Sequence, residues 1–154
     1  MKTVTGILVV VAASMGASPA DDAEPAATRP AAVRFTSVAV YVDSGDTPLA
    51  AYQVEVMAKG GDVKIVGVEG GAHQAFADAP RYDPAALKGG RIIIAAFNTG
   101  KDLPTGRTRV ATVHVVISGD AKPVYNVTLT TAADADGRRI APAVSLVPAK
   151  EDTP

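Results

Sequence analysis

Ala51-Tyr-Gln-Val-Glu-Val-Met57 shows most clearly to which fold class this chain belongs. Tyr52, Val54 and Val56 fall on one face of an extended chain, and the glutamine and glutamate between them fall on the other. Successive side chains of a β-strand point to opposite sides of the sheet, so this strict alternation is typical of a strand with one buried and one wet face. The stretch therefore predicts an amphipathic β-strand.

The same period of two, or a high content of β-branched residues, marks five further strands. These are residues 35–42, 63–68, 92–97, 109–117 and 124–130. The core-facing residues expected on the last two are Ala111, Val113, Val115 and Ile117, and then Tyr125, Val127 and Leu129. Residues 92–97 are apolar on both faces, which predicts a central strand.

Short glycine-containing turns separate these strands, and no long helical pattern lies between them. Many short strands joined in this way favour an all-β fold, an antiparallel β-sandwich. One short helical turn is expected after residue 82. Asp83 can cap it, Pro84 fits its first position, and Gly89 can end it.

The ends of the chain differ in composition from this body. Residues 1–20 combine Lys2, an apolar run and a small-residue cleavage site, which is the pattern of a signal peptide. Residues 21–32 form an Ala/Pro-rich linker expected to be disordered, residues 33–147 the folded domain, and residues 148–154 a disordered tail. The protein is therefore expected to be secreted or periplasmic. The apolar run is too short for a membrane span.

The charge and composition of the chain narrow the range of functions that it can have. The 154 residues carry a formal net charge of -1 and contain no cysteine and no tryptophan. Without a basic patch, a nucleic-acid partner is not expected. Without cysteine, neither a disulfide framework nor a thiolate metal site is possible.

The order of segments resembles a known family. Val38-Ala-Val-Tyr-Val-Asp-Ser-Gly45 comes first, then the stretch 52–56, then Gly90-Arg-Ile-Ile-Ile-Ala-Ala-Phe-Asn98, and Asp136-Gly137 lies near the end. This succession resembles the cohesin-like domains, which share a jelly-roll sandwich with several carbohydrate-binding modules. The resemblance implies a cohesin-like jelly-roll fold and a surface-binding role. It transfers no set of dockerin-contacting residues, and the glycine-containing strand with which cohesins usually open is absent.

No catalytic or metal-binding constellation emerges from the polar residues. His73 and His114 are the only histidines and lack the three or four converging ligands of a zinc site. Asp134 and Asp136 resemble the start of a calcium loop, but the residues that follow do not continue it, and a tight turn is the better interpretation. Carboxylates that could serve a glycoside hydrolase are Glu69, Asp78, Asp83 and Asp102. Sequence alone cannot place them as a catalytic pair. We therefore expect no enzyme activity and no cofactor.

The long segment between Gly70 and Gly90 is the expected recognition region, because loops of about 20 residues are often functional. Its candidate contact residues are His73, Phe76, Arg81, Tyr82 and Asp83. The alternative is that Phe76 and Tyr82 close one end of the core while Asp83 only caps a helical turn. The expected function is a secreted, non-catalytic binding or assembly module with an unknown protein or polysaccharide partner at the cell envelope. A carbohydrate-binding module is the alternative, and an extracytoplasmic glycoside hydrolase is a more remote one.

Overall fold

The computed structural model describes residues 32–149, and these form eight strands and two short 3-10 turns. The strands are β1 (Val33–Asp43), β2 (Leu49–Lys59), β3 (Asp62–Gly70), β4 (Arg81–Tyr82), β5 (Arg91–Phe97), β6 (Arg107–Ser118), β7 (Val124–Asp134) and β8 (Ala143–Pro148). The turns are η1 (Gln74–Phe76) and η2 (Pro84–Ala86). The expected signal peptide, and nearly all of the expected linker and tail, lie outside the described residues.

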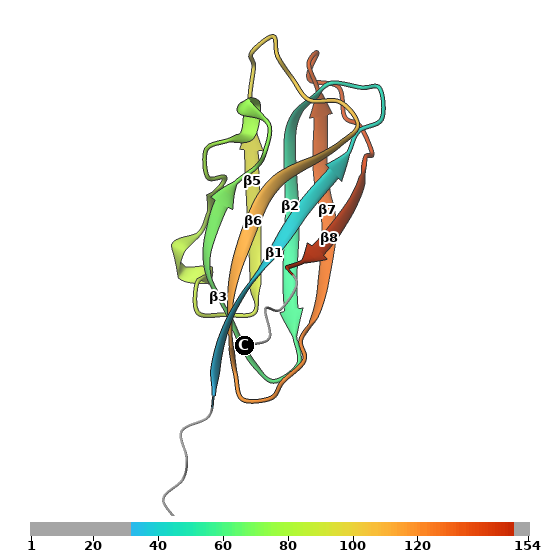
Figure 1. Ribbon diagram of the computed structural model, residues 1–154. Helices are drawn as coiled ribbons and strands as arrows, with labels where there is room; N and C mark the ends of the chain where they lie inside the picture. The colour runs from blue at the N-terminus through green and yellow to red at the C-terminus, as the bar shows by residue number, and fades with distance from the viewer. Residues whose placement is uncertain (1–31, 150–154) are drawn as a thin grey trace, which may run out of the picture.

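Two antiparallel four-stranded sheets pack face to face, which confirms the predicted all-β sandwich (Figure 1). One sheet has the order β3-β6-β1-β8 and the other the order β4-β5-β2-β7. We call them sheet A and sheet B. Strand β1 pairs with β8, β2 with β7, β3 with β6 and β4 with β5. This nested pairing, in which the chain folds back on itself as one long rolled hairpin, is that of a jelly roll.

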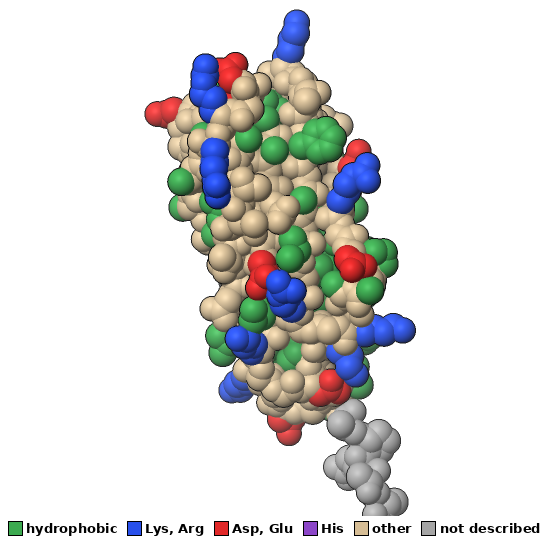
Figure 2. All heavy atoms as spheres, turned by 180° about the vertical axis from the view of Figure 1, so that it is seen from behind, with side chains coloured by type: hydrophobic (Ala, Val, Ile, Leu, Met, Phe, Trp, Pro, Cys, Tyr) green, Lys and Arg blue, Asp and Glu red, His purple; other side chains and the backbone are tan. Residues whose placement is uncertain are grey.

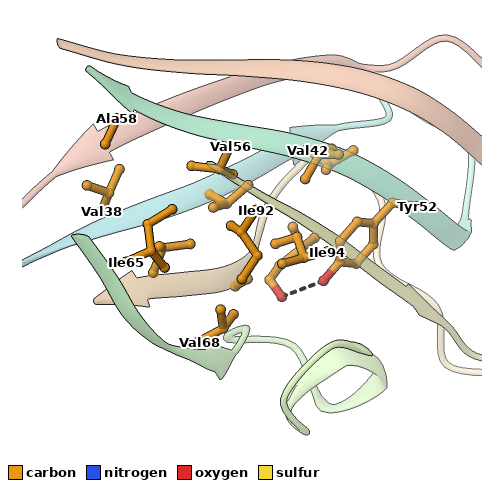
Figure 3. Close-up of a cluster of buried hydrophobic side chains, with 14 of the residues drawn as sticks. Val38, Val42, Tyr52, Val56, Ala58, Ile65, Val68, Ile92 and Ile94 are labelled. Carbon is orange, nitrogen blue, oxygen red and sulfur yellow. Dashed lines mark hydrogen bonds between the residues drawn. The ribbon is translucent and has the colours of Figure 1, made fainter. Parts of the chain in front are cut away.

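The core lies between the two sheets and is built from their alternating inward residues (Figure 3). Val54 and Val56 of β2 are fully buried, as the stretch 51–57 predicts, and Val56 faces Ile65 of β3 and Val38 of β1 across the sandwich. Most core residues are valine or isoleucine, whose branched side chains suit a pleated, buried surface. Tyr52 is also buried, and its hydroxyl satisfies its hydrogen-bonding need by donating to the main chain of β6.

Strand β6 departs from simple alternation at one point. Val40 of β1 lies opposite Ala111, but the next residue of β1, Tyr41, lies opposite Arg109. Val110 is therefore an extra residue in β6, a β-bulge, and both it and Ala111 are fully buried. The Val110 carbonyl accepts the hydrogen bond from the Tyr52 hydroxyl at 3.0 Å.

Strand β5 is an inner strand of sheet B, in agreement with the central position that its sequence predicts. It pairs along its length with β2, but on its other side it has only the two-residue strand β4. Ile92 and Ile94 are buried in the core, whereas Ile93 and Phe97 point to the outside of sheet B and are 38% and 69% exposed. No described element covers the outer face of sheet B. Its apolar side chains stay at the surface.

Candidate functional site

The segment between β3 and β5, which the sequence marks as the recognition region, is held tightly against the sandwich. Gly70 and Gly71 lie so close to main-chain carbonyl groups of Ala77 and Arg109 that a Cβ atom at either position would overlap them. The amide of Gly71 donates to the carbonyl of Phe76 at 2.6 Å, and the amide of Ala72 donates to that of Arg109 at 2.9 Å. These two glycines therefore serve close packing rather than a flexible turn.

Phe76 belongs to the core. It is 2% exposed, and its ring meets that of Tyr52 edge-on, with the centroids 5.3 Å apart and the planes at 76°. Burial raises the pKa of the Tyr52 hydroxyl well above its usual range. Phe76 offers a partner almost no exposed surface, so its burial favours the core role over the contact role.

Two other candidates of this segment make local contacts. The Nδ1 atom of His73 accepts a hydrogen bond from the amide of Ala75 at 3.2 Å and caps η1. The Oδ1 atom of Asp83 accepts one from the amide of Ala85 at 2.9 Å, which is the capping contact that the sequence predicts. Both side chains thus fix the path of the chain.

Arg81 and Tyr82 form β4 and point in opposite directions. Tyr82 lies opposite Ile94 and is half-buried against the core, whereas Arg81 lies opposite Ala95 and is exposed. Ala95 faces outward, so Arg81 stands on the outer face of sheet B. Of the five candidate residues, Arg81 is the one whose charged group is presented on a sheet face.

The register of sheet B brings small residues together on this outer face. Ala51 lies between Phe97 and Ala133, and the next outward position of β2, Gln53, lies between Ala95 and Thr131. Three alanines in adjacent strands leave a shallow hollow of about 230 Å³. Figure 2 shows the molecule from this side, with hydrophobic side chains spread over the face between scattered charged ones.

Two further hollows adjoin the first. One, of about 390 Å³, is bounded by β4, η2 and the start of β5, and the other, of about 310 Å³, by residues 75–81 and the end of β5. Arg81 and Ala95 line all three hollows, and Phe97 lines two of them. On the outer face of sheet B, the hollows therefore meet around one group of residues, which we call its centre. This group consists of Arg81, the exposed ring of Phe97, and the three alanines that form the floor of the first hollow, Ala51, Ala95 and Ala133.

The arginines of the described residues differ in how their side chains are engaged. Apart from Arg81, every described arginine contacts another residue of the domain through its side chain. These pairs are Arg34 with Ala121, Arg91 with Glu55, Arg107 with Tyr41, Arg109 with Thr112, Arg138 with Asp136, and Arg139 with Thr130. Hydrogen bonding to Glu55 raises the pKa of Arg91. Within residues 32–149 the guanidinium of Arg81 has no such contact.

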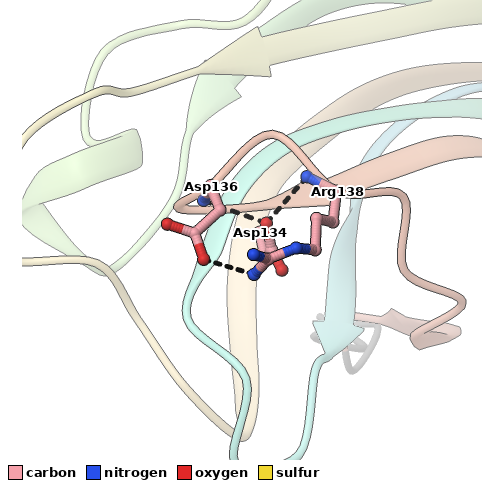
Figure 4. Close-up of polar contacts among 3 residues, drawn as sticks. All are labelled: Asp134, Asp136 and Arg138. Carbon is pink, nitrogen blue, oxygen red and sulfur yellow. Dashed lines mark hydrogen bonds and ion pairs between the residues drawn. The ribbon is translucent and has the colours of Figure 1, made fainter.

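The acidic turn after β7 is built as a turn and not as a calcium loop (Figure 4). The Oδ1 atom of Asp134 accepts hydrogen bonds from the amides of Asp136 and Arg138, at 2.9 and 2.8 Å. The carboxylate of Asp136 pairs with the guanidinium of Arg138. Across the described part of the chain, no three His, Cys, Asp or Glu residues are grouped so that they could hold a metal ion.

The other polar candidates are scattered. Glu69 lies 3.2 Å from the Nε2 atom of His114 on the outside of sheet A, and Asp102 lies 3.9 Å from the Nε2 atom of His73. Asp83 caps η2. These carboxylates each have a different neighbour, and the contacts recorded for them join none of them into a carboxylate pair.

Searches of protein-family models, of curated proteins and of solved structures find no match for this chain. None of the helical segments within residues 32–149 has the length and apolar character needed to cross a bilayer.

Sequence reasoning found Arg81 but missed the rest of this centre. Phe97, Ala51, Ala95 and Ala133 come from three strands, and only the register of sheet B makes them neighbours. One signal could have identified the surface. Residues 92–97 are apolar at every position, and a strand with only one buried face leaves half of such residues exposed.

Proposed function

We propose that this chain is a secreted, non-catalytic binding and assembly module of the cohesin-like type, and that it binds a protein partner through the outer face of sheet B. The observation that carries the proposal is the centre of that face. There, Phe97 is 69% exposed beside a hollow floored by alanines and bordered by Arg81. Aromatic residues and arginine are enriched where proteins bind one another, and apolar surface that remains exposed often marks such a site.

The way this face is built favours recognition of a partner without rearrangement. Ala51, Ala95 and Ala133 lie on paired strands whose opposite faces are packed in the core, so the main chain beneath the hollow is held in place. A rigid, preformed surface binds without first having to become ordered. This suits an assembly module, which presents a fixed surface to its partner.

A carbohydrate-binding module is the second candidate, and one feature favours it. Gln53, Arg81 and Thr131 place polar groups beside the ring of Phe97, as a sugar would require. Against it, the two strongly exposed aromatic residues, Phe35 and Phe97, lie on different sheets, so the described residues offer one strongly exposed ring on each face and not a row of such rings. We therefore favour a protein partner.

The test fills the alanine-lined hollow on the outer face of sheet B with a larger side chain. Ala51→Arg places a long side chain on the outer face of sheet B, and Ala39→Arg is its matched control, a half-buried outward alanine at a similar position on β1 of sheet A. Wild-type protein and both variants are immobilised and incubated with an envelope fraction, and the retained proteins and polysaccharides are quantified.

We expect a retained protein that is lost with Ala51→Arg and kept with Ala39→Arg. Both variants should unfold within a few degrees of wild type, which shows that the sandwich is intact. Retention of the same protein by Ala51→Arg would refute the proposed face. Retention of polysaccharide in its place would favour the carbohydrate-binding alternative.

A further inference from the structure

We infer that Arg81 is a specificity-determining residue that pairs with a carboxylate on an acidic peptide segment of the partner, while Phe97 and the alanine hollow accept an apolar side chain of the same segment. This inference rests on the proposed function, because it assigns the chemistry of the ligand to the same face. It predicts a partner sequence in which Asp or Glu stands close to an apolar residue.

The first argument is the free guanidinium. The side chains of the other described arginines contact groups of the protein itself. Arg91, for example, pairs with Glu55 a short way along the same face. Arg81 has no such partner within the described residues, although it lies on a paired strand and its main chain is held by Ala95. An arginine whose main chain is held and whose five donors are unused is suited to bind a planar anion from outside.

The second argument is position. Arg81 and Ala95 are directly opposite each other, and Phe97 is the next outward residue of β5. Diagonal neighbours of this kind on one sheet face are about 7–8 Å apart, so one short segment can reach both the guanidinium and the ring. The three hollows meet at Arg81, which leaves room for the segment to enter and leave.

The third argument concerns the type of anion. One guanidinium matches one carboxylate in charge and in the geometry of two parallel hydrogen bonds. A phosphate dianion would call for a second free cation, and the nearest arginine on β5, Arg91, is already paired with Glu55. The floor of alanines favours an apolar side chain over a ring carrying several hydroxyl groups. Together these features favour an acidic peptide over a phosphopeptide or an acidic sugar.

The test uses a random peptide library displayed on phage, selected against the wild-type protein. Selected peptides are then synthesised in two forms, with their Asp and Glu residues retained or replaced by Asn and Gln, and their dissociation constants are measured. The protein variants are Arg81→Gln, Arg91→Gln as the matched control that removes a charge already paired, and Ala51→Arg, which blocks the face. Polygalacturonate serves as the acidic sugar.

We expect selected peptides that contain Asp or Glu, and a roughly tenfold weaker binding when the carboxylates become amides or when Arg81 becomes glutamine. The two changes combined should cost little more than either alone, because they remove the same contact. Arg91→Gln should bind within about twofold of wild type, as expected for an exposed charge that is already paired.

Other outcomes separate the two proposals. If Ala51→Arg abolishes peptide binding while Arg81→Gln and the amide peptides bind normally, the face is correct and the role of Arg81 is refuted. If Ala51→Arg binds every selected peptide as wild type does, the proposed face itself fails. Binding of polygalacturonate that depends on Arg81, with no acidic peptide selected, would also overturn the peptide assignment.

Discussion

Phe76→Ala tests whether the aromatic residue in the segment between β3 and β5 supports the fold. The ring is 2% exposed, so its removal leaves a cavity between the end of the sandwich and η1. Truncation of a buried phenylalanine to alanine costs about 3–5 kcal/mol of the free energy of unfolding. The edge-on contact with Tyr52 accounts for about 0.5–1.5 kcal/mol of that loss.

A loss of this size is a large part of the total stability of a small domain, which is about 5–15 kcal/mol. Equilibrium unfolding in urea, followed by circular dichroism, measures it as a lower midpoint with an unchanged slope. Phe76→Leu keeps most of the volume and loses the ring contact, so we expect its cost to lie well below that of the alanine variant.

Phe97→Ala is the matched control, since Phe97 belongs to sheet B but is 69% exposed. It should change the free energy of unfolding by no more than about 0.5 kcal/mol, as is usual for surface substitutions. If Phe76→Ala cost less than about 1 kcal/mol, or no more than Phe97→Ala, the assignment of Phe76 to the core would be refuted.

Four further predictions follow from other features. Gly70→Ala should destabilise the domain by at least about 2 kcal/mol, because its Cβ would overlap the carbonyl of Ala77. The control Gly67→Ala, whose Cβ would meet nothing closer than 3.9 Å, should fold normally. Equal melting temperatures of the two variants would contradict this prediction. Burial raises the pKa of Tyr52 above the ordinary value of about 10, so the unfolded chain loses this proton first as pH rises, and stability should fall above about pH 10 by up to about 1.4 kcal/mol per pH unit. Tyr52→Phe should lack that contribution, and parallel pH curves for the two proteins would disprove it. Excess chelator should leave the melting temperature unchanged, because Arg138 neutralises Asp136 in the turn after β7; a fall of several degrees would show a bound ion. Intact-mass measurement of exported protein should show loss of about the first 20 residues, and a mature chain that begins at Met1 would exclude a cleaved signal.

Local alternation was enough to predict the sandwich and much of its core. Val54 and Val56 are buried because apolar and polar residues alternate along β2, and the cap at Asp83 was predicted from the proline that follows it. What could not be predicted depends on contacts between distant segments. The bulge at Val110 arises from pairing with β1, and the identity of the strand beside β5 cannot be read from residues 91–97 alone.

In the candidate site, too, one part could be predicted from local sequence and another part could not. Arg81 attracts notice in the sequence because a charged residue lies in a long connecting segment, but nothing local indicates that its guanidinium lacks a partner within residues 32–149. The hollow beside it is formed by Ala51, Ala95 and Ala133, three residues too common to be noticed singly. Their grouping is a property of the strand register, which depends on the whole sheet.

The nested pairing of the strands has a consequence for when this protein can fold. Asp43 at the end of β1 pairs with Ala143 at the start of β8, a residue one hundred positions later, and no two strands that follow each other in the described chain are neighbours in sheet A. Sheets dominated by such distant pairings fold slowly, because the entropy cost of closing long loops comes before the stabilising contacts can form. During synthesis, the emerging chain cannot assemble its core until nearly all of it has left the ribosome. If the chain is exported, as its proposed function requires, we expect the nascent protein to remain unfolded long enough to pass through an export channel and to form its sheets only after crossing the membrane.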